Sequence, residues 1–258
     1  MIPPSPYYSD TAFGILTPLA VVYSLAAHVW TYLGSARRDA SSSVLPSGNN
    51  QKQTRIAIVT GSNTGIGYET ARSLAVDYGM TVVLACRSRD KGLQAAAQIE
   101  QEAKKSQQQG SAAFVHPLDL SSPQSIQEFV AAVKEKYSKI DILVNNAGRN
   151  SNSPDPIEGT TRDALFQTNF LGHFELTAAL MDILAPKARV VNLASVMHHF
   201  VNGNVNEVSF WKDCLTHNAT TSTSKYAASK LAAILFTCEL NRKYGHRIEA
   251  VAVNPGGV

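Results

Sequence analysis

The stretch RIAIVTGSNTGIGYETARSLAVDYG at residues 55–79 decides the fold, because three different patterns follow one another within it. Residues 55–60 are apolar and rich in β-branched side chains, which predicts a short buried strand. A glycine-rich loop follows at 60–67, and residues 68–78 repeat apolar side chains at helical spacing. A strand, a glycine loop and a helix in this order are the context that a phosphate-binding loop requires.

The loop suits a dinucleotide through its three glycines and the start of its helix. Gly61 permits a tight turn, Gly65 lets the backbone approach a pyrophosphate, and Gly67 allows close packing of the helix. The free N–H groups and the positive dipole end of the helix favour an anion there. A plain turn is the alternative interpretation. The residues expected to contact the cofactor here are Gly61, Ser62, Thr64, Gly65, Ile66 and Gly67.

Strand and helix patterns continue to alternate along the chain. Further apolar runs, which predict buried strands, lie at 81–86, 112–116, 140–144, 188–193 and 248–253. Helical patterns follow the second strand to residue 109, begin again at Ser122-Pro123, and span 163–184 and 225–244. This alternation predicts an α/β fold with a doubly wound parallel sheet of the Rossmann type. Burial on both faces explains why the strands are continuous apolar runs.

Charged residues after the second and third strands bear on the type of dinucleotide. Arg87 ends the second strand, where the ribose would lie, and a guanidinium can pair with a 2′-phosphate. With Arg89 and Lys91 nearby it favours NADP(H) over NAD; a solvated loop arginine is the alternative. Asp119 is expected to accept from the adenine amine, or else to cap a helix, and Leu120 is expected beside the ring.

A second turn and two polar residues extend the candidate site. Asn146, Ala147 and Gly148 follow the fourth strand, where small residues allow the backbone to approach the cofactor, although alone they indicate only a turn. Asn169 is a poor helix former inside a helical pattern, so its side chain or freed backbone would hold a water. Ser195 follows the fifth strand, where its hydroxyl would bind a substrate carbonyl.

Tyr226 and Lys230 are the pair that carries the predicted chemistry. Their i,i+4 spacing on a helix places both side chains on one face. A phenol has a free pKa of about 10 and exchanges protons poorly at neutral pH. A cation within about 4–6 Å lowers such a pKa by about one to three pH units. With the glycine loop, this pair predicts hydride transfer with a nicotinamide cofactor.

Composition argues against several other classes of function. The net charge of +3 over 258 residues is small, so nothing indicates a nucleic-acid partner. The three cysteines lack metal-ligand spacing and fit an intracellular enzyme rather than a disulfide scaffold. His198, His199 and His217 have no carboxylate or cysteine at a spacing suitable for a metal. A hydrolase built on Ser195 would need a G-x-S-x-G motif, which the sequence lacks there.

The amino-terminal segment differs in character from the rest. No Asp, Glu, Lys or Arg occurs at 11–34, and two arginines follow shortly after. As a helix this stretch would span about 36 Å, enough for a hydrocarbon core of about 30 Å. We therefore expect residues 1–34 to anchor the chain in a membrane, with the catalytic domain in the cytosol; a signal peptide and a peripheral helix are the alternatives. Residues 35–54 predict a polar linker to one domain at 55–258.

Taken in order, these motifs resemble the short-chain dehydrogenase/reductase family. The shared pattern is TGxxxGIG at 60–67, NNAG at 145–148, Asn169, Ser195, YxxxK at 226–230 and NPG at 254–256. The stretches TGSNTGIGYETA, LACR, NFLGHF and ILFTCEL are similar to the branch of the retinol dehydrogenases and WW-domain oxidoreductases. The resemblance covers residues 55–258 and implies a Rossmann fold.

The resemblance implies a role for each catalytic residue. Tyr226 would be the general acid in reduction and the general base in oxidation. Lys230 would lower the pKa of that phenol and hold the nicotinamide ribose. Ser195 would orient the substrate carbonyl, and Asn169 would anchor a proton-relay water.

The resemblance also implies the partners. The segment between the serine and the tyrosine is long, as in this branch, and would form part of the substrate wall. Phe200, Phe210 and Trp211 suit a lipophilic ketone, aldehyde or alcohol, or else pack locally. NADP(H), such a substrate and a homodimer through the two long helices are the expected partners.

The chain departs from the family pattern at its end. It stops at Gly256-Gly257-Val258, where the family continues, so the last strand and the helices that close the substrate pocket would be missing. Pro255, Gly256 and Val258 are still expected to contact the cofactor. Either the sequence is partial, or the chain is a truncated, inactive homologue that binds cofactor or a protein partner.

Overall fold

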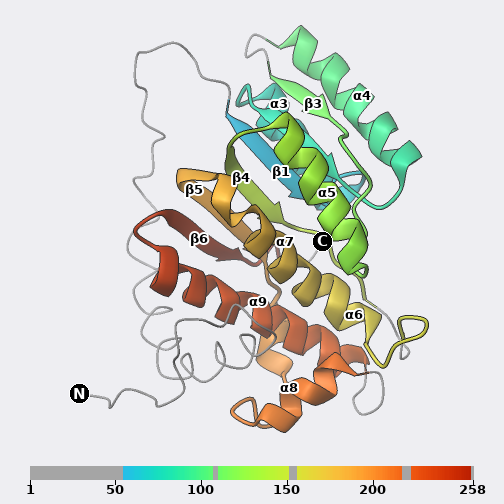
Figure 1. Ribbon diagram of the computed structural model, residues 1–258, viewed down its shortest axis with the longest axis vertical. Helices are drawn as coiled ribbons and strands as arrows, with labels where there is room; N and C mark the ends of the chain where they lie inside the picture. Colours follow the sequence, from blue (N-terminus) through green and yellow to red (C-terminus); the bar gives the residue numbers. More distant parts are fainter. Residues whose placement is uncertain (1–54, 107–109, 151–155, 217–221, 257–258) are drawn as a thin grey trace.

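Six parallel strands form one sheet in the part of the chain that this computed structural model describes, residues 55–106, 110–150, 156–216 and 222–256 (Figure 1). The strands are β1 Ile56–Thr60, β2 Thr81–Ala85, β3 Ser111–Ala113, β4 Ile140–Asn145, β5 Leu184–Leu193 and β6 Ile248–Val253. Their order in the sheet is β3-β2-β1-β4-β5-β6, and every pairing is parallel. The predicted doubly wound fold is confirmed.

Helices cover both faces of this sheet. The α-helices are α3 Gly65–Val76, α4 Arg89–Lys105, α5 Pro123–Lys136, α6 Ala164–Phe166, α7 Gly172–Leu180, α8 Val208–Leu215 and α9 Ser222–Tyr244. Short turns add the π-helical η1 Gln167–Leu171 and the 3₁₀-helical η2 Met181–Ile183 and η3 Val196–Phe200. In Figure 1, α5, α7 and α9 lie over one face of the sheet, and α3 packs with α4 on the other.

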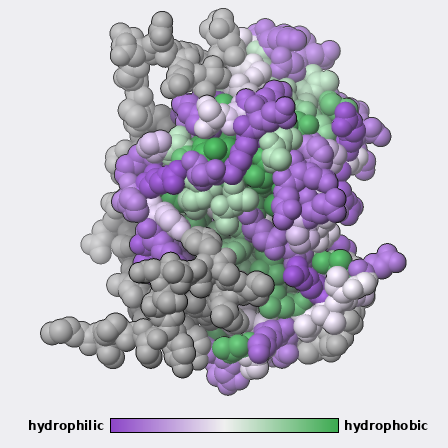
Figure 2. Space-filling view, in the orientation of Figure 1, coloured by the Kyte–Doolittle hydropathy of each residue, from purple (hydrophilic) through white to green (hydrophobic). Residues whose placement is uncertain are grey.

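Successive residues of β1 point to opposite faces and divide the core in two. Ile58 packs in the cluster that α5 and α9 close with Phe129 and Phe236. Its neighbour Val59 packs in the other cluster, which includes Ile99 of α4. The strand is therefore buried on both faces, as its continuous apolar sequence predicts. On the face shown in Figure 2, hydrophobic residues gather in a central band between hydrophilic regions.

Two strands have bounds that differ from the predicted ones. β3 is shorter than the apolar run at 112–116, and β5 begins well before the run at 188–193. β5 starts at Leu184, which pairs with Ile140 of β4 before the register of the two strands shifts. Within this irregular part Lys187 has a left-handed φ of 64°. A strand that is interrupted in this way loses its continuous apolar pattern, so its first half is not visible in the sequence.

The helical pattern predicted at 163–184 is confirmed, but the segment consists of α6, η1, α7 and η2 in direct succession rather than one regular α-helix. In η1 the N–H of Gly172 donates to the carbonyl of Gln167, an i to i−5 pairing that inserts one extra residue into the helix. Asn169 lies inside this turn. Such π-helical turns often occur at functional sites.

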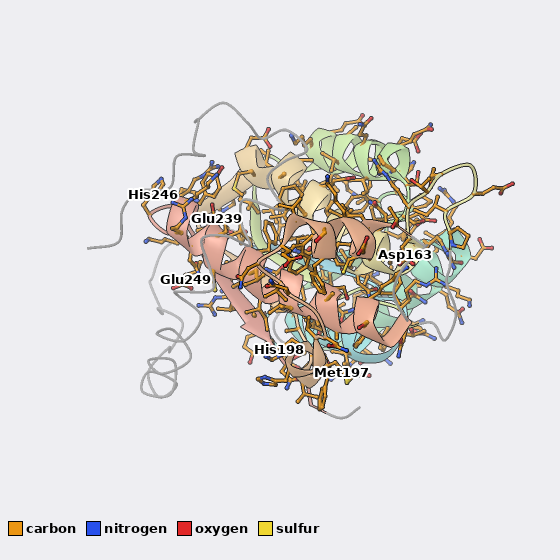
Figure 3. All side chains as sticks on the ribbon, turned by 90° about the horizontal axis from the view of Figure 1, so that it is seen from below. Asp163, Met197, His198, Glu239, His246 and Glu249 are labelled. Carbon is orange, nitrogen blue, oxygen red and sulfur yellow. The ribbon has the colours of Figure 1, made fainter. Side chains whose placement is uncertain are left out.

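A buried ion pair holds the start of α9 against α6. Lys225 Nζ lies 2.8 Å from Asp163 Oδ2, and the two side chains are 1% and 2% exposed. Lys225 also donates to the Thr216 carbonyl at 2.8 Å, and Asp163 Oδ1 accepts from the Phe166 N–H, which caps α6. Both charged groups therefore have further hydrogen bonds, as a buried pair requires. Figure 3 shows Asp163 at the opposite end of α9 from Glu239.

Within the described ranges, no helix is both long and apolar enough to cross a membrane. The predicted anchor at 1–34 and the predicted linker at 35–54 lie outside those ranges, as does Val258. The functions expected of these residues therefore stay predictions.

Candidate active site

A cleft of about 670 Å³ opens at the carboxyl edge of the sheet, beside the glycine loop. Its walls come from the loop after β1, the ends of β2 and β4, and the segment after β3. Open α/β sheets bind ligands at this edge, at the point where the strand order reverses, here between β1 and β4. The predicted cofactor residues that line the cleft are Gly61, Thr64, Ile66, Gly67, Arg87, Asp119, Leu120, Asn146, Ala147 and Gly148.

Six described residues among the predicted cofactor contacts do not line this cleft: Tyr226 and Lys230, whose positions are given below, and Ser62, Gly65, Pro255 and Gly256. Ser62 is fully buried, and its Oγ accepts from the Ala85 N–H at 3.2 Å, so it holds the loop to the end of β2. Gly65 lines a neighbouring hollow on the surface of α3. Pro255 and Gly256 are exposed after β6. For these residues the motif indicated the right region of the fold but not a place in the cleft wall.

The missing side chains of two glycines let the β1 loop and the β4 turn come together. Gly61 has a φ of +64°, and a Cβ on it would lie 2.9 Å from Ala147 Cα. A Cβ on Gly67 would collide with the side-chain amide of Asn146. Gly67 therefore lets α3 lie close to Asn146, which agrees with its predicted role in close packing of the helix.

Thr60, the last residue of β1, joins the same two turns through its hydroxyl. Thr60 Oγ1 accepts from the N–H groups of Asn146 and Ala147, each at 2.9 Å. In return the Asn146 side chain donates to the Thr60 carbonyl at 2.7 Å. Thr60 is absent from the predicted site, although a hydroxyl directly before the glycine loop is a usable sequence signal.

The side-chain amide of Asn169 forms two hydrogen bonds with the backbone of Arg149. Its Oδ1 accepts from the Arg149 N–H at 2.8 Å, and its Nδ2 donates to the Arg149 carbonyl at 2.9 Å. Nδ2 also lies 3.4 Å from Ser229 Oγ, whose hydroxyl donates to the Tyr226 carbonyl at 2.7 Å. The amide therefore fixes the chain directly after the 145–148 turn, and the water expected at the side chain or backbone of Asn169 stays a prediction.

Lys230 lies between the end of β5 and the 145–148 turn. The residue is 5% exposed, and its Nζ donates to the Leu193 carbonyl at 2.9 Å. Burial lowers the pKa of Lys230 to about 8. Nζ is 5.5 Å from the ring centroid of the half-buried Tyr226, and 3.7 Å from where a Cβ on Gly148 would lie. The structure thus brings the predicted pair together beside the turn that follows β4.

Ser195 lies at the end of β5, where it caps the short turn η3. Its Oγ accepts from the Met197 N–H at 3.3 Å, a contact that leaves the hydroxyl proton for donation to another group. The Ser195 carbonyl is 2.6 Å from His198 Nδ1, and the His198 ring lies on that of His199 with centroids 3.9 Å apart. Met197 and His198 lie at the edge of the molecule in Figure 3.

A family model described as short chain dehydrogenase matches residues 55–207. This chain belongs to the short-chain dehydrogenase family. It is 40% identical to mouse retinol dehydrogenase 12 over 215 residues, which are 81% of this chain and 63% of that protein. The WW domain-containing oxidoreductase of Drosophila melanogaster is 36% identical over 209 residues, 79% of this chain and 49% of that protein. The chain thus spans about half to two thirds of these relatives.

Solved structures of short-chain dehydrogenases share this fold. One from Shigella flexneri, complexed with NADP, is 25% identical with a TM-score of 0.59, and the match covers 79% of this chain and 77% of that one. Pseudomonas aeruginosa RhlG, also in complex with NADP, is 25% identical with a TM-score of 0.61, covering 79% and 73%. The predicted resemblance to the family, and to its retinol dehydrogenase branch, is confirmed.

In this member of the family, the two charged residues predicted at the adenosine end have different surroundings. Arg87 is exposed and lines the cleft directly after β2. Asp119 also lines the cleft, but its Oδ1 accepts from the N–H and the hydroxyl of Ser121, at 2.9 Å and 2.6 Å. Ser122 caps α5 by accepting from the Ser125 N–H. Asp119 does not cap this helix itself; through Ser121 it stabilises the turn that precedes the helix.

His173 is a buried residue near this site that the sequence prediction did not include. It lies in α7, is 5% exposed, and its Nε2 is 2.9 Å from Thr60 Oγ1. Burial lowers the pKa of His173 to about 4, and the nearby charge of Lys230 acts in the same direction. Its position four residues after Asn169 is the only sequence signal. Further cleft residues outside the prediction are Asn63, Ala85, Cys86, Leu118, Ser121, Arg149, Asn150 and Thr168.

His173 should make the stability of the protein depend on pH. The unfolded chain takes up a proton near the ordinary pKa of 6.5, whereas the folded chain does so only near 4. Unfolding is therefore favoured as the pH falls from 6.5 towards 4. The free energy of unfolding should decrease by about 2 kcal/mol between about pH 7.5 and 5 because of this histidine. Urea unfolding of the wild type and of His173→Phe at both pH values measures the loss. The wild type should lose more; equal losses would rule out a buried neutral histidine.

Proposed function

We propose that this chain is an NADP(H)-dependent oxidoreductase that acts on a lipophilic carbonyl compound or alcohol. The observation that carries the proposal is the fixed Lys230 ammonium, 5.5 Å from the Tyr226 ring and close to the turn that lines the cleft. A nicotinamide dinucleotide would supply or accept the hydride. Because the chain matches only part of these relatives, the activity of the whole protein is part of this proposal.

The residues around the cleft fit the phosphates of a dinucleotide. Gly61 and Gly65 have φ values of 64° and 58°, which glycine adopts without strain, and the loop leads into the first turn of α3. That turn contains no acidic residue, and among the described side chains Thr64 at its N-cap makes no capping hydrogen bond. The first N–H groups of α3 and its dipole therefore suit an anion such as a pyrophosphate.

The proposed proton transfer uses Tyr226 and its neighbours. Tyr226 would donate its phenolic proton to the substrate oxygen in reduction and take the proton back in oxidation. The Lys230 ammonium would stabilise the phenolate that this leaves. Ser195 would donate a hydrogen bond to the same oxygen and keep its proton, because its contact with Met197 uses only a lone pair. Asn169 would act by fixing the Arg149 backbone.

The preference for NADP(H) rests on Arg87. Its side chain is exposed in the cleft at the end of β2, where a ribose 2′-phosphate would lie. A guanidinium forms charge-assisted hydrogen bonds with a phosphate. Arg89 and Lys91, in the first turn of α4, add positive charge. The related structures complexed with NADP support this choice of cofactor.

A lipophilic substrate is supported by the relatives and by one exposed aromatic residue. Retinol, which appears in the names of the relatives, is a lipophilic alcohol. Phe200 is 65% exposed and lies in η3, the turn that Ser195 caps. Trp211, by contrast, is 5% exposed, contacts the Phe210 ring at 5.0 Å and donates to the Val205 carbonyl. Of the three aromatics considered for the substrate wall, Trp211 therefore packs locally.

We further propose that residues 1–34 attach the chain to a membrane, because the stretch at 11–34 carries no Asp, Glu, Lys or Arg. The arginines that follow this stretch would keep the catalytic domain in the cytosol. A homodimer through the segments at 163–184 and 225–244 is implied by the family resemblance.

The wild-type chain should oxidise NADPH with lipophilic aldehydes or ketones, and Tyr226→Phe should lower kcat by about 10²–10⁴-fold, because the general acid is lost. NADPH absorbance follows the reaction, and NADPH binding should persist in the variant. Tyr244→Phe, at the other end of α9, is the matched control and should keep full activity. NADPH binding by the wild type without turnover on a broad carbonyl panel would instead favour an inactive, cofactor-binding homologue.

Arg87→Ala should raise the KM for NADPH by about 10–100-fold, which corresponds to the loss of a charged hydrogen bond of about 1.5–3 kcal/mol. The KM for NADH should change little, because NADH has no 2′-phosphate. Arg89→Ala, two residues later, removes a charge without removing the cleft contact and should have a smaller effect. Equal changes of KM for both nucleotides in Arg87→Ala would contradict the assignment.

A further inference from the structure

We infer that His173 is a positioning residue of this site, a neutral imidazole protonated on Nδ1 that links the Asn169 carbonyl to the Thr60 hydroxyl. Its effect on activity rests on the proposed function, whereas the state of the imidazole follows from hydrogen-bond geometry alone.

The imidazole lies between two buried residues. His173 is in the first turn of α7, directly after the π-helical turn η1. Its Nδ1 is 3.2 Å from the Asn169 carbonyl oxygen, and its Nε2 is 2.9 Å from Thr60 Oγ1. All three residues are buried: His173 is 5% exposed, Asn169 4% and Thr60 0%. Bulk water therefore cannot replace a hydrogen bond that is lost between them.

The hydrogen-bond partners decide which nitrogen carries the proton. A carbonyl oxygen can only accept, so Nδ1 of His173 donates to Asn169. In a neutral imidazole Nε2 is then an acceptor, and it receives the hydroxyl proton of Thr60. Thr60 Oγ1 keeps two lone pairs, which accept from the N–H groups of Asn146 and Ala147. Every donor and acceptor in this set is matched.

The other protonation states of the ring do not match these partners. A proton on Nε2, in an imidazolium or in the other neutral tautomer, would be a third N–H donor to Thr60 Oγ1, which has only two lone pairs. The Thr60 proton would also have to turn to the Val144 carbonyl, 3.3 Å away. The other neutral tautomer would, in addition, set the Nδ1 lone pair against the Asn169 carbonyl oxygen. Such mismatches are costly in a buried site, so the neutral Nδ1–H form is assigned.

The ring connects the two halves of the site. Through the Thr60 hydroxyl it acts on the 145–148 turn, which lines the cofactor cleft. Through the Asn169 carbonyl it acts on the residue whose side chain holds Arg149 on the other side of that turn. A ring without charge also avoids a second buried cation near Lys230, whose own charge opposes protonation of His173.

The state of the imidazole can be measured by ¹⁵N NMR of the full chain labelled at histidine, without cofactor. The chain has seven histidines, and the signal that disappears in His173→Asn belongs to His173. At pH 7 we expect a protonated Nδ1 and an unprotonated Nε2. A protonated Nε2, with or without a proton on Nδ1, overturns the inference whatever the activity of the protein.

The positioning role is tested by two substitutions of His173. His173→Phe keeps a ring but neither hydrogen bond, so the NADPH Kd should rise about 10-fold and kcat should fall, while the KM for the carbonyl substrate changes little. His173→Asn keeps an N–H close to the place of Nδ1 and should recover part of the lost kcat. If His173 had only a structural role, its substitution would lower the amount of folded protein. It would not lower the kcat of the folded protein while leaving the KM for the carbonyl substrate nearly unchanged.

Leu176→Ala is the matched control, because Leu176 is a fully buried residue of the same helix with an apolar side chain. It should lower stability and leave the NADPH Kd and the kcat of the folded protein unchanged. Unchanged Kd and kcat in His173→Phe would overturn the positioning role. If the wild type neither binds nor oxidises NADPH, the proposed function fails, and the NMR measurement still upholds or overturns the inference about the imidazole.

Discussion

The hydroxyl of Thr60 is the contact on which the arrangement of the site depends. β1 and β4 are neighbours in the sheet, and both end at the edge where the cleft opens. The N–H groups of Asn146 and Ala147 leave the strand ladder at that point and need new partners. Thr60 Oγ1 accepts from both, which holds the turn after β4 against the glycine loop. Gly61 and Gly67 have no side chain that would prevent this close approach. This part of the cleft wall therefore depends on the Thr60 hydroxyl and on these two glycines.

A second set of contacts, on β5 and α9, positions the chemical groups. The end of β5 fixes the Lys230 ammonium through the Leu193 carbonyl, and helical spacing then places Tyr226 on the same face of α9. The buried pair of Lys225 and Asp163 holds the start of this helix to α6. Removing one partner of such a pair leaves an uncompensated buried charge, so the position of α9 is strongly constrained. The phenol is therefore placed by the fold before any substrate is bound.

The sheet and much of the cleft could be predicted because both follow from local sequence patterns. β1, β2, β4 and β6 have bounds within one residue of the predicted ones, since apolar runs depend on near neighbours. The bridge from Thr60 through His173 could not be predicted, because it joins residues that only the folded sheet brings together. Ser62 shows the same limit: its motif indicated a cofactor contact, whereas its hydroxyl accepts from Ala85 of β2. The π-helical turn around Asn169 depends likewise on contacts across the fold.

The NADPH dissociation constant of Thr60→Val is the most direct measurement, because valine keeps nearly the shape of threonine and lacks only the hydroxyl. Titration followed by NADPH fluorescence should show a Kd raised at least about 10-fold, with an unchanged far-UV circular dichroism spectrum. Thr177→Val is the matched control: it removes a buried hydroxyl that accepts from Asn145 and does not line the cleft, and it should bind as the wild type does. Equal Kd values for the wild type and Thr60→Val would show that the cleft forms without this hydroxyl, and would contradict the role assigned to Thr60.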